Sequence, residues 1–146
     1  MQQVERVLGY EFSNSKLRDE ALLAAGTSVS DPKVRGDLRG NKRLAMVGDA
    51  VLQLVVLEKW YGEGTDPSVG NKLLKETVSN AALRVRASKA HLQHMIRLNP
   101  CQKGEAPQET LASTVEALVG AVWFDSSGDI DMVREVMAKL GVFRHE

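Results

Sequence analysis

Apolar residues recur every three or four positions along most of this 146-residue chain, and no run of them alternates with a period of two. The first spacing puts apolar side chains on one face of an α-helix, whereas a half-buried strand needs the second. The longest helical pattern runs from about Asn41 to Tyr61, and the stretch from Glu109 to Phe124 is strongly apolar. The sequence therefore predicts an all-α fold.

Shorter helices and loops are predicted around these two segments. The helices are expected at Val4–Leu8, from a cap at Ser13 or Asn14 to near Gly26, and at Val69–Ser79, Ala81–Ala90 and Ile130–Leu140. Gly62, Gly64 and Pro67 are expected to close the long helix. Residues 28–40 and 99–107 are polar and contain proline and glycine, which is typical of loops. Because no linker or internal repeat separates these elements, we predict one helical domain over residues 1–146.

Composition sets only loose limits on function. Lys plus Arg equals Asp plus Glu at 19 each, and this neutral total neither demands nor excludes a polyanionic partner. The single cysteine, Cys101, excludes an internal disulfide and a multi-cysteine zinc site. No segment approaches the roughly 18 consecutive apolar residues that span a bilayer, and residues 1–9 lack the apolar core of a signal peptide. We expect an intracellular protein without a membrane partner, in a compartment that the sequence does not distinguish.

Two segments go beyond a helical pattern. The first reads Asn-Lys-Arg-Leu-Ala-Met-Val-Gly-Asp-Ala-Val-Leu from Asn41 to Leu52, and the second Leu-Ala-Ser-Thr-Val-Glu-Ala-Leu-Val-Gly-Ala from Leu111 to Ala121. They resemble the ribonuclease III signature, typically Asn-Glu-Arg-Leu-Glu-Phe-Leu-Gly-Asp, and the family's second acidic helix, typically Leu-Ala-Asp-Thr-Leu-Glu-Ala-Leu-Ile-Gly-Ala. Leu8-Gly9-Tyr10-Glu11-Phe12 is similar to its opening Leu-Gly-Tyr-x-Phe, and residues 73–80 are similar to its middle helix. These matches keep the family's order from about Val4 to Leu140.

The resemblance implies the ribonuclease III endonuclease-domain fold and, in an active member, RNA cleavage through Mg²⁺ held by acidic side chains. The positions that are acidic in such a member hold Lys42, Ala45, Asp49, Ser113 and Glu116 here. Metal ligation is implied mainly for the last four, of which two keep a carboxylate. We therefore expect Asp49 and Glu116 to be the remnant catalytic and metal-ligating residues of a degenerate site. Mg²⁺ is the expected cofactor if the site is active, and none is expected otherwise.

Helical spacing indicates how these residues meet. Positions 42, 45 and 49 share one helix face, as do 113 and 116, and the resemblance implies that the two faces pack together. Cleavage through Mg²⁺ needs hard oxygen ligands there, to polarise the phosphoryl oxygen and activate water. Ala45 cannot ligate, and the neutral hydroxyl of Ser113 replaces aspartate poorly. Since Lys42 adds a positive charge where the cation is expected, we hypothesise that it pairs with Asp49, and with Glu116, in place of Mg²⁺.

Simpler interpretations stay open for several residues. Asp49 could be an exposed helix residue, and Glu116 could form a structural salt bridge inside its apolar helix. His91 and His94 lie three residues apart without a third metal ligand, so we interpret them as solvated or facing RNA. Cys101 has no evident base partner for a catalytic role. Packing is favoured over base stacking for the two tryptophans, Trp60 and Trp123.

A dimer and an RNA surface are also implied by the resemblance, because family members are symmetric homodimers. Met46 is expected to press into the partner subunit, although burial in its own core predicts the same residue. The expected RNA-binding residues are Lys42, Arg43, Lys72 and Lys75, within wider basic groups that include Lys33, Arg35, Arg39, Arg84, Arg86 and Lys89. We expect no C-terminal double-stranded-RNA-binding domain after residue 146, and therefore modest, salt-sensitive affinity.

Three functions remain open. The favoured one is a ribonuclease III-like domain that binds structured or double-stranded RNA as a homodimer with lost or impaired cleavage, in RNA processing or a ribonucleoprotein, as mitochondrial ribosomal members of the fold do. The alternative is an active Mg²⁺-dependent double-stranded-RNA endonuclease that combines Asp49 and Glu116 with a replacement acid, Glu109, Asp37 or Glu76. The third is a scaffold whose partner is a protein.

Overall fold

The computed structural model describes residues 1–25, 39–98 and 107–143. Its helices are α1 (Gln3–Leu8), α2 (Ser15–Ala21), α4 (Lys42–Glu63), α5 (Pro67–Val78), α6 (Asn80–Lys89), the 3-10 turn η1 (Leu92–His94), α7 (Gln108–Asp125) and α8 (Ile130–Leu140). Within these described residues, β pairing is limited to an isolated bridge between Leu23 and Arg97. The all-α prediction is therefore confirmed.

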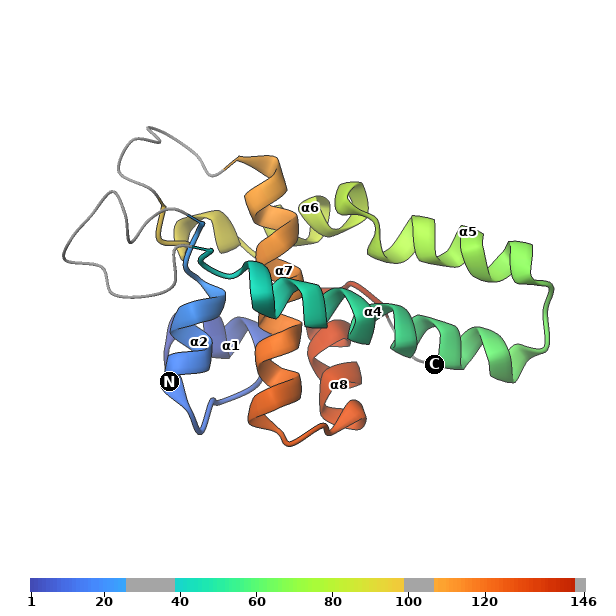
Figure 1. Cartoon of the computed structure of the whole chain (residues 1–146), viewed down its shortest axis with the longest axis horizontal. Helices are drawn as coiled ribbons and strands as arrows, with labels where there is room; N and C mark the ends of the chain where they lie inside the picture. The colour runs from blue at the N-terminus through green and yellow to red at the C-terminus, as the bar shows by residue number, and fades with distance from the viewer. Residues whose placement is uncertain (26–38, 99–106, 144–146) are drawn as a thin grey trace.

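Helix α7 runs through the centre of the molecule, with α4, α6, α2 and α8 packed against it (Figure 1). Its side chains are buried on nearly every face, as expected of a helix that is apolar all round. The residues buried along it are Leu111, Ala112, Thr114, Val115, Ala117, Leu118, Val119, Gly120, Ala121 and Val122. Trp123 packs against this core, as the sequence predicts. Across the described part of the chain, no helix combines the length and apolarity that crossing a membrane requires.

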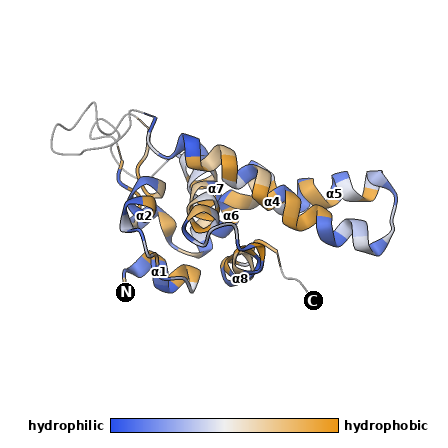
Figure 2. Ribbon diagram, turned by 60° about the horizontal axis from the view of Figure 1, so that its bottom comes forward, coloured by the Kyte–Doolittle hydropathy of each residue, from blue (hydrophilic) through white to orange (hydrophobic). Residues whose placement is uncertain are grey.

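The distal half of α4 and the whole of α5 form an arm that extends away from the central helix (Figures 1 and 2). Trp60 joins the two helices: its indole N–H donates to the Asp66 carbonyl at 3.1 Å, and its ring lies against Gly70. The prediction that Pro67 closes α4 is wrong. Pro67 instead begins α5 behind an Asp66 cap, because the first turn of a helix does not need the N–H that proline lacks.

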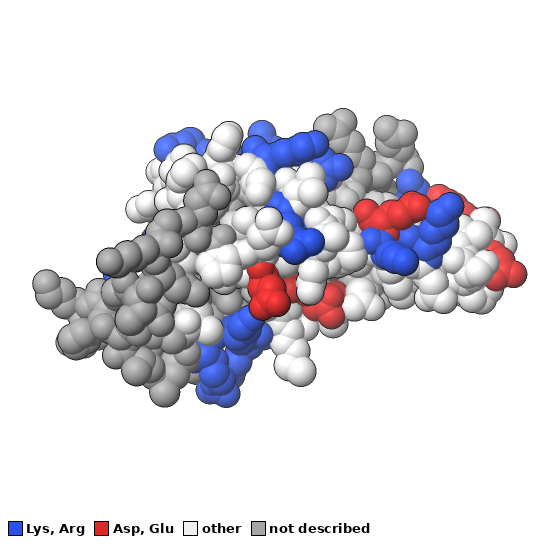
Figure 3. All heavy atoms as spheres, turned by 90° about the horizontal axis from the view of Figure 1, so that it is seen from above, with Lys and Arg blue, Asp and Glu red and all other residues white. Residues whose placement is uncertain are grey.

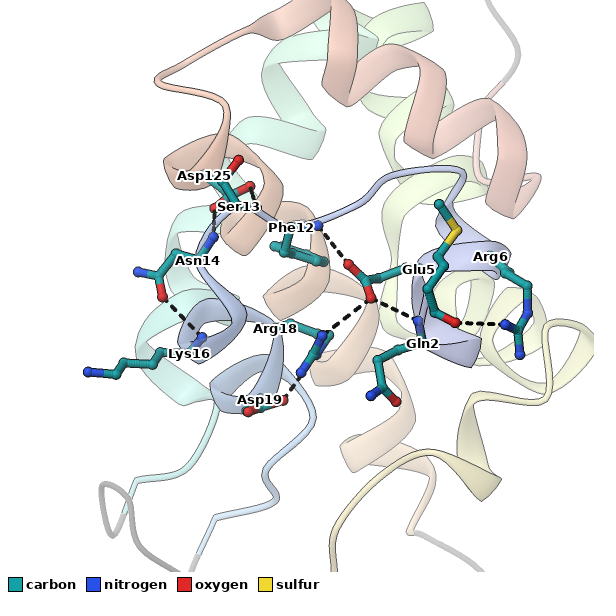
Figure 4. A network of polar contacts seen from close by, with 11 residues as sticks. Gln2, Glu5, Arg6, Phe12, Ser13, Asn14, Lys16, Arg18, Asp19 and Asp125 are labelled. Carbon is teal, nitrogen blue, oxygen red and sulfur yellow. Dashed lines mark hydrogen bonds and ion pairs between the residues drawn. The ribbon is translucent and has the colours of Figure 1, made fainter.

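Two carboxylates anchor the N-terminal segment to the core (Figure 4). The Glu5 carboxylate accepts from the backbone N–H groups of Gln2 and Phe12, at 2.9 and 2.7 Å, and from Arg18. Asp125 accepts from the Tyr10 hydroxyl at 2.6 Å and from two backbone N–H groups of the same segment. Burial acts to raise the pKa of both carboxyls, but these donors outweigh it and lower each pKa overall. Both groups are therefore held ionised.

Helix α2 ends earlier than predicted, at Ala21 and not near Gly26. The following residues leave the helix to pair with a distant segment: Arg97 N–H donates to the Leu22 carbonyl at 2.8 Å, and Ala24 N–H donates to the Arg97 carbonyl at 2.9 Å. The Leu23 carbonyl then accepts from Asn41 N–H at 2.8 Å, at the start of α4. A long-range pairing thus overrides the local helical pattern.

Helices α4 and α7 touch backbone to backbone where they cross. A Cβ atom added to Gly48 would lie 1.6 Å from the Glu116 carbonyl oxygen, and one added to Gly120 would lie 2.3 Å from the Leu44 carbonyl oxygen. Real Cβ atoms do not approach backbone this closely, so only glycine fits at either position. The crossing brings the two segments singled out in the sequence into direct contact.

This contact predicts the effect of a single methyl group. Gly48→Ala should lower the free energy of unfolding by at least about 3 kcal/mol, because the two helix backbones must separate and the core around them must repack. Gly62→Ala is the matched control, since nothing lies within 4 Å of the added atom in the same helix. It should leave stability unchanged or slightly raised. Urea denaturation of both variants checks this, and equal midpoints would contradict the crossing described here.

Candidate functional site

The α4–α7 crossing places Asp49 beside Glu116. Asp49 follows the contact glycine of α4, and Glu116 supplies the backbone carbonyl that this glycine faces. Both side chains are half-buried, and their carboxyl groups hydrogen-bond to each other. The Gln53 amide, one turn further along α4, donates to Asp49 Oδ2 at 3.0 Å. Asp49 is therefore not a freely exposed helix residue, which excludes the simplest interpretation of it.

Burial and the neighbouring Asp49 together raise the pKa of Glu116 to about 7. Burial is the largest cause, the hydrogen bond and charge of Asp49 add to it, and the positive charge of Lys42 acts in the opposite direction. Two neighbouring carboxylates repel each other when both are ionised, so a proton on Glu116 relieves the repulsion. At neutral pH Glu116 therefore holds a proton for much of the time.

Lys42 bonds to a different group from the one expected. Its Nζ lies 3.3 Å from Ser113 Oγ, and among the described residues no ion pair within 4.0 Å joins it to Asp49 or to Glu116. The hypothesis of a direct salt bridge is wrong, because Lys42 lies two helical turns from Asp49 and its chain reaches across to α7. The charge of Lys42 still acts on Glu116 through space. No ion pair in the same set involves Glu116, so a structural salt bridge does not explain it either.

A buried amide fixes the start of α4, and we did not identify it from the sequence. Asn41 is 1% exposed, and its Nδ2 donates to the Ala21 carbonyl at 3.0 Å and to Thr114 Oγ1 at 3.2 Å. The Thr114 hydroxyl in turn donates to the Thr110 carbonyl at 2.7 Å. These bonds tie α4 to α2 and α7 and so set Lys42 opposite Ser113. The feature of the sequence that could have identified Asn41 is its place as the first residue of the segment that resembles the ribonuclease III signature.

The side chains at the crossing do not fit a divalent metal. Among the described residues at the crossing, carboxyl oxygens come from Asp49 and Glu116, and the positive charge of Lys42 acts on Glu116, where a metal cation would have to bind. Ala45 is buried without a ligating atom, and Ser113 offers a hydroxyl that already contacts Lys42. Among the described residues, no group of three or more His, Cys, Asp or Glu side chains is placed to hold a metal ion.

The two proposed replacement acids that the structure describes, Glu109 and Glu76, do not join this pair. Glu109 lies on the rim of a small hollow near the first turn of α7, together with Lys42 and Ser113. Glu76 is exposed on α5, 3.9 Å from Lys72. Asp37 and Cys101 lie outside the described residues. His91 and His94 stack on each other with ring centres 6.4 Å apart, and both are exposed.

Met46 points away from its own core. Its side chain is 80% exposed, next to a hollow of about 410 Å³ lined by Leu17, Glu20, Arg43, Leu44, Val47 and Phe124. Phe124 is itself 51% exposed at this hollow. Burial of Met46 within its own subunit is therefore wrong as an explanation. A protruding apolar side chain beside an apolar hollow can associate with a second, matching surface.

The predicted RNA-binding residues lie at the start of α4 and on α5, which is part of the arm. Lys42 and Arg43 are exposed in the first turn of α4, and Lys72 and Lys75 are exposed on α5. In the face seen from above, Lys and Arg side chains form separate groups around a small central acidic patch (Figure 3). Lys33 and Arg35 lie outside the described residues. The described part thus presents positive charge on several sides of its acidic residues.

Comparison with known proteins shows the family of this chain. A family model described as Ribonuclease-III-like matches residues 29–140. Ribonuclease 3 of Rickettsia felis is 30% identical over 144 residues, covering 95% of this chain and 62% of the relative. For Ribonuclease 3 of Campylobacter curvus the identity is 28% over 145 residues, covering 96% of this chain and 60% of the relative. The chain thus spans about three fifths of the length of these curated relatives.

A solved structure confirms the fold predicted from the sequence. The nuclease domain of ribonuclease III from Campylobacter jejuni, described for structural flexibility in its region involved in dimer formation, matches with a TM-score of 0.81 at 23% identity. The match covers 95% of this chain and 94% of that one. At this identity the likeness concerns the fold alone.

The raised pKa of Glu116 predicts a pH-dependent stability. The unfolded carboxyl ionises near its ordinary value of 4.5 and the folded one near 7, so between these values the folded state binds more protons. The free energy of unfolding therefore falls as pH rises through that window. Glu116→Gln removes the ionisation, so its thermal midpoint should exceed that of the native chain at pH 8, and this advantage should shrink towards pH 4. Glu76→Gln, at an exposed position, is the control; the same response from both variants would refute the carboxyl pairing.

Proposed function

Since this chain belongs to the ribonuclease-III-like family, we propose that it binds structured or double-stranded RNA as a homodimer and that its cleavage activity is lost or impaired. The role belongs to RNA processing or to a ribonucleoprotein, and an RNA partner fits the intracellular location expected from the sequence. The chain shares its helical fold with the nuclease domain of ribonuclease III. Fold alone does not establish cleavage, so the proposal depends on the residues at the α4–α7 crossing.

The observation on which the proposed loss of cleavage depends is the pairing of Asp49 with Glu116. At the positions where the resemblance implies acids, these two side chains keep a carboxyl, and they bond to each other. Ala45 and Ser113 supply none, and Lys42 replaces a negative charge with a positive one. A degenerate site of this kind has fewer carboxylate ligands than the resemblance implies for metal-dependent hydrolysis. It keeps the surface that surrounds them.

The surface around the pair supports an RNA partner. Duplex RNA is recognised mainly through phosphates and 2′-hydroxyls, by shape and not by sequence. Lys42, Arg43, Lys72 and Lys75 offer exposed positive charge on α4 and α5. In a dimer each of these positions is present twice on one surface. A few phosphate contacts give weak binding at physiological salt that strengthens as salt falls.

A homodimer is supported by the surface around Met46. The protruding side chain and the adjacent hollow are on the same chain, so a two-fold axis can insert each Met46 into the partner's hollow. Leu54 and Tyr61 are also exposed on α4, eight and fifteen residues after Met46. This spacing keeps all three on one side of the helix. The apolar surface therefore continues beyond the hollow along the arm.

Cleavage and binding of a long RNA duplex test the proposed function together. We expect no cleavage by the purified protein with Mg²⁺ or Mn²⁺, and a mobility shift of the RNA that weakens as salt rises. Lys72→Ala/Lys75→Ala should weaken the shift. Lys139→Ala is the matched control, because α8 lies at the bottom of Figure 1, away from the face shown in Figure 3.

The same assay separates the competing functions. Metal-dependent cleavage that disappears in an Asp49→Ala/Glu116→Ala double variant would establish an active endonuclease and contradict the lost activity. Absence of both cleavage and RNA binding would favour a scaffold with a protein partner. Cleavage that persists in the double variant comes from a contaminating nuclease, which purification must remove.

Self-association is tested at Met46. Met46→Glu should convert the dimer to a monomer in light scattering after gel filtration, because a carboxylate loses its hydration against the apolar lining from Leu17, Leu44 and Phe124. Val85→Glu, at another exposed apolar residue, lies on α6 and should leave the dimer intact. A native chain that is monomeric at all concentrations, or a Met46→Glu variant that stays dimeric, would contradict this interface.

A further inference from the structure

Lys42 supplies a positive charge that acts on Glu116 of the Asp49–Glu116 pair. It is exposed in the first turn of α4, and its Nζ contacts Ser113 Oγ on α7 at 3.3 Å. The acceptor hydroxyl is neutral, so this bond does not cancel the lysine charge. The ammonium is therefore held over the α4–α7 crossing with its charge available to a further anion.

A hollow beside Lys42 has the features of an anion site. Its volume is about 210 Å³, and its lining includes Asn41, Lys42, Thr110 and Ser113. Both α4 and α7 begin at this hollow, and neither has a side chain capping its first turn. Uncapped N–H groups and the helix dipole at two N-termini favour negative charge. The rim carries one carboxylate, the exposed Glu109.

The crossing and the hollow thus favour different charges. The crossing keeps two carboxyl groups, with Ala45 and Ser113 at positions where the resemblance implies acids, and the hollow next to it combines a lysine ammonium with two helix N-termini. In a metal-dependent site the cation lies between the carboxylates and a phosphate of the substrate. Here a covalently attached ammonium is available for the same phosphate, as a point charge.

We propose that the Lys42 ammonium is the cation of this site, binding an RNA phosphate directly where a divalent metal would otherwise bridge it to the protein. This inference rests on the proposed function, since it names the group that contacts the RNA. It makes RNA binding independent of divalent metal. It also identifies Lys42, and not Asp49 or Glu116, as the residue whose charge decides what the site holds.

The affinity for a short RNA duplex, measured in EDTA and in Mg²⁺ at matched ionic strength, tests the metal independence. The native chain should bind equally in both. Lys42→Gln should weaken binding equally in both and should reduce the slope of log affinity against log salt by about 1 for each Lys42 that contacts a phosphate. Unchanged affinity and slope in Lys42→Gln, with RNA binding otherwise intact, would overturn the inference and leave the proposed function standing.

Charge reversal gives a readout that needs no RNA. Lys42→Glu puts three carboxylates, at positions 42, 49 and 116, around the crossing, so Mn²⁺ or Mg²⁺ should raise its thermal midpoint and should leave that of the native chain unchanged. Lys75→Glu has the same charge change on α5 and should show no metal response. A native chain that is itself stabilised by these metals would overturn the inference. Failure of the native chain to bind RNA in either buffer would instead overturn the proposed function.

Discussion

The backbone contact between α4 and α7 at Gly48 and Gly120 is the constraint on which the rest of the molecule depends. Two helices can approach this closely only where neither has a side chain, and the apolar residues on both sides then close around the contact. The crossing fixes the rotation of each helix. It therefore determines which residues face each other: Asp49 meets Glu116, and Lys42 meets Ser113.

Because the crossing depends on glycines and apolar packing, the fold does not require a complete acidic site. Ala45 and Ser113 can occupy positions associated with acids while the helices stay in place. The two remaining carboxyls are left close together in a half-buried setting, where burial and the neighbouring Asp49 raise the pKa of Glu116. This electrostatic strain lies where α4 and α7 cross, and positively charged side chains lie around it (Figure 3).

Local patterns in the sequence predict the helices well, because periodic burial against one central helix repeats over many turns. They fail where distant segments compete. The end of α2 was placed too late because the pairing of Leu22 and Ala24 with Arg97 joins segments more than seventy residues apart. Pro67 was assigned to the wrong helix because the same residue can follow one helix or begin the next. In both cases the local sequence allows either structure, and contacts with other segments decide which one forms.

The candidate site could also be predicted only in part from the sequence. Spacing predicts that positions 42, 45 and 49 share a face, and the resemblance pairs that face with 113 and 116. Neither predicts that Lys42 contacts Ser113 and not Asp49, which depends on the reach of one side chain across the crossing. The exposure of Met46 is equally open in the sequence, because burial in a core and insertion into a partner select the same residue type. The role of Asn41 becomes visible only once α2, α4 and α7 are placed together.

The most direct test of a metal-free RNA site is a crystal structure of the protein bound to an RNA duplex, grown with Mn²⁺ and measured at the manganese absorption edge. We predict no anomalous peak between Asp49 and Glu116, and a phosphate oxygen within hydrogen-bond distance of the Lys42 ammonium. A manganese ion ligated by both carboxylates, with Lys42 turned away from the RNA, would contradict the account.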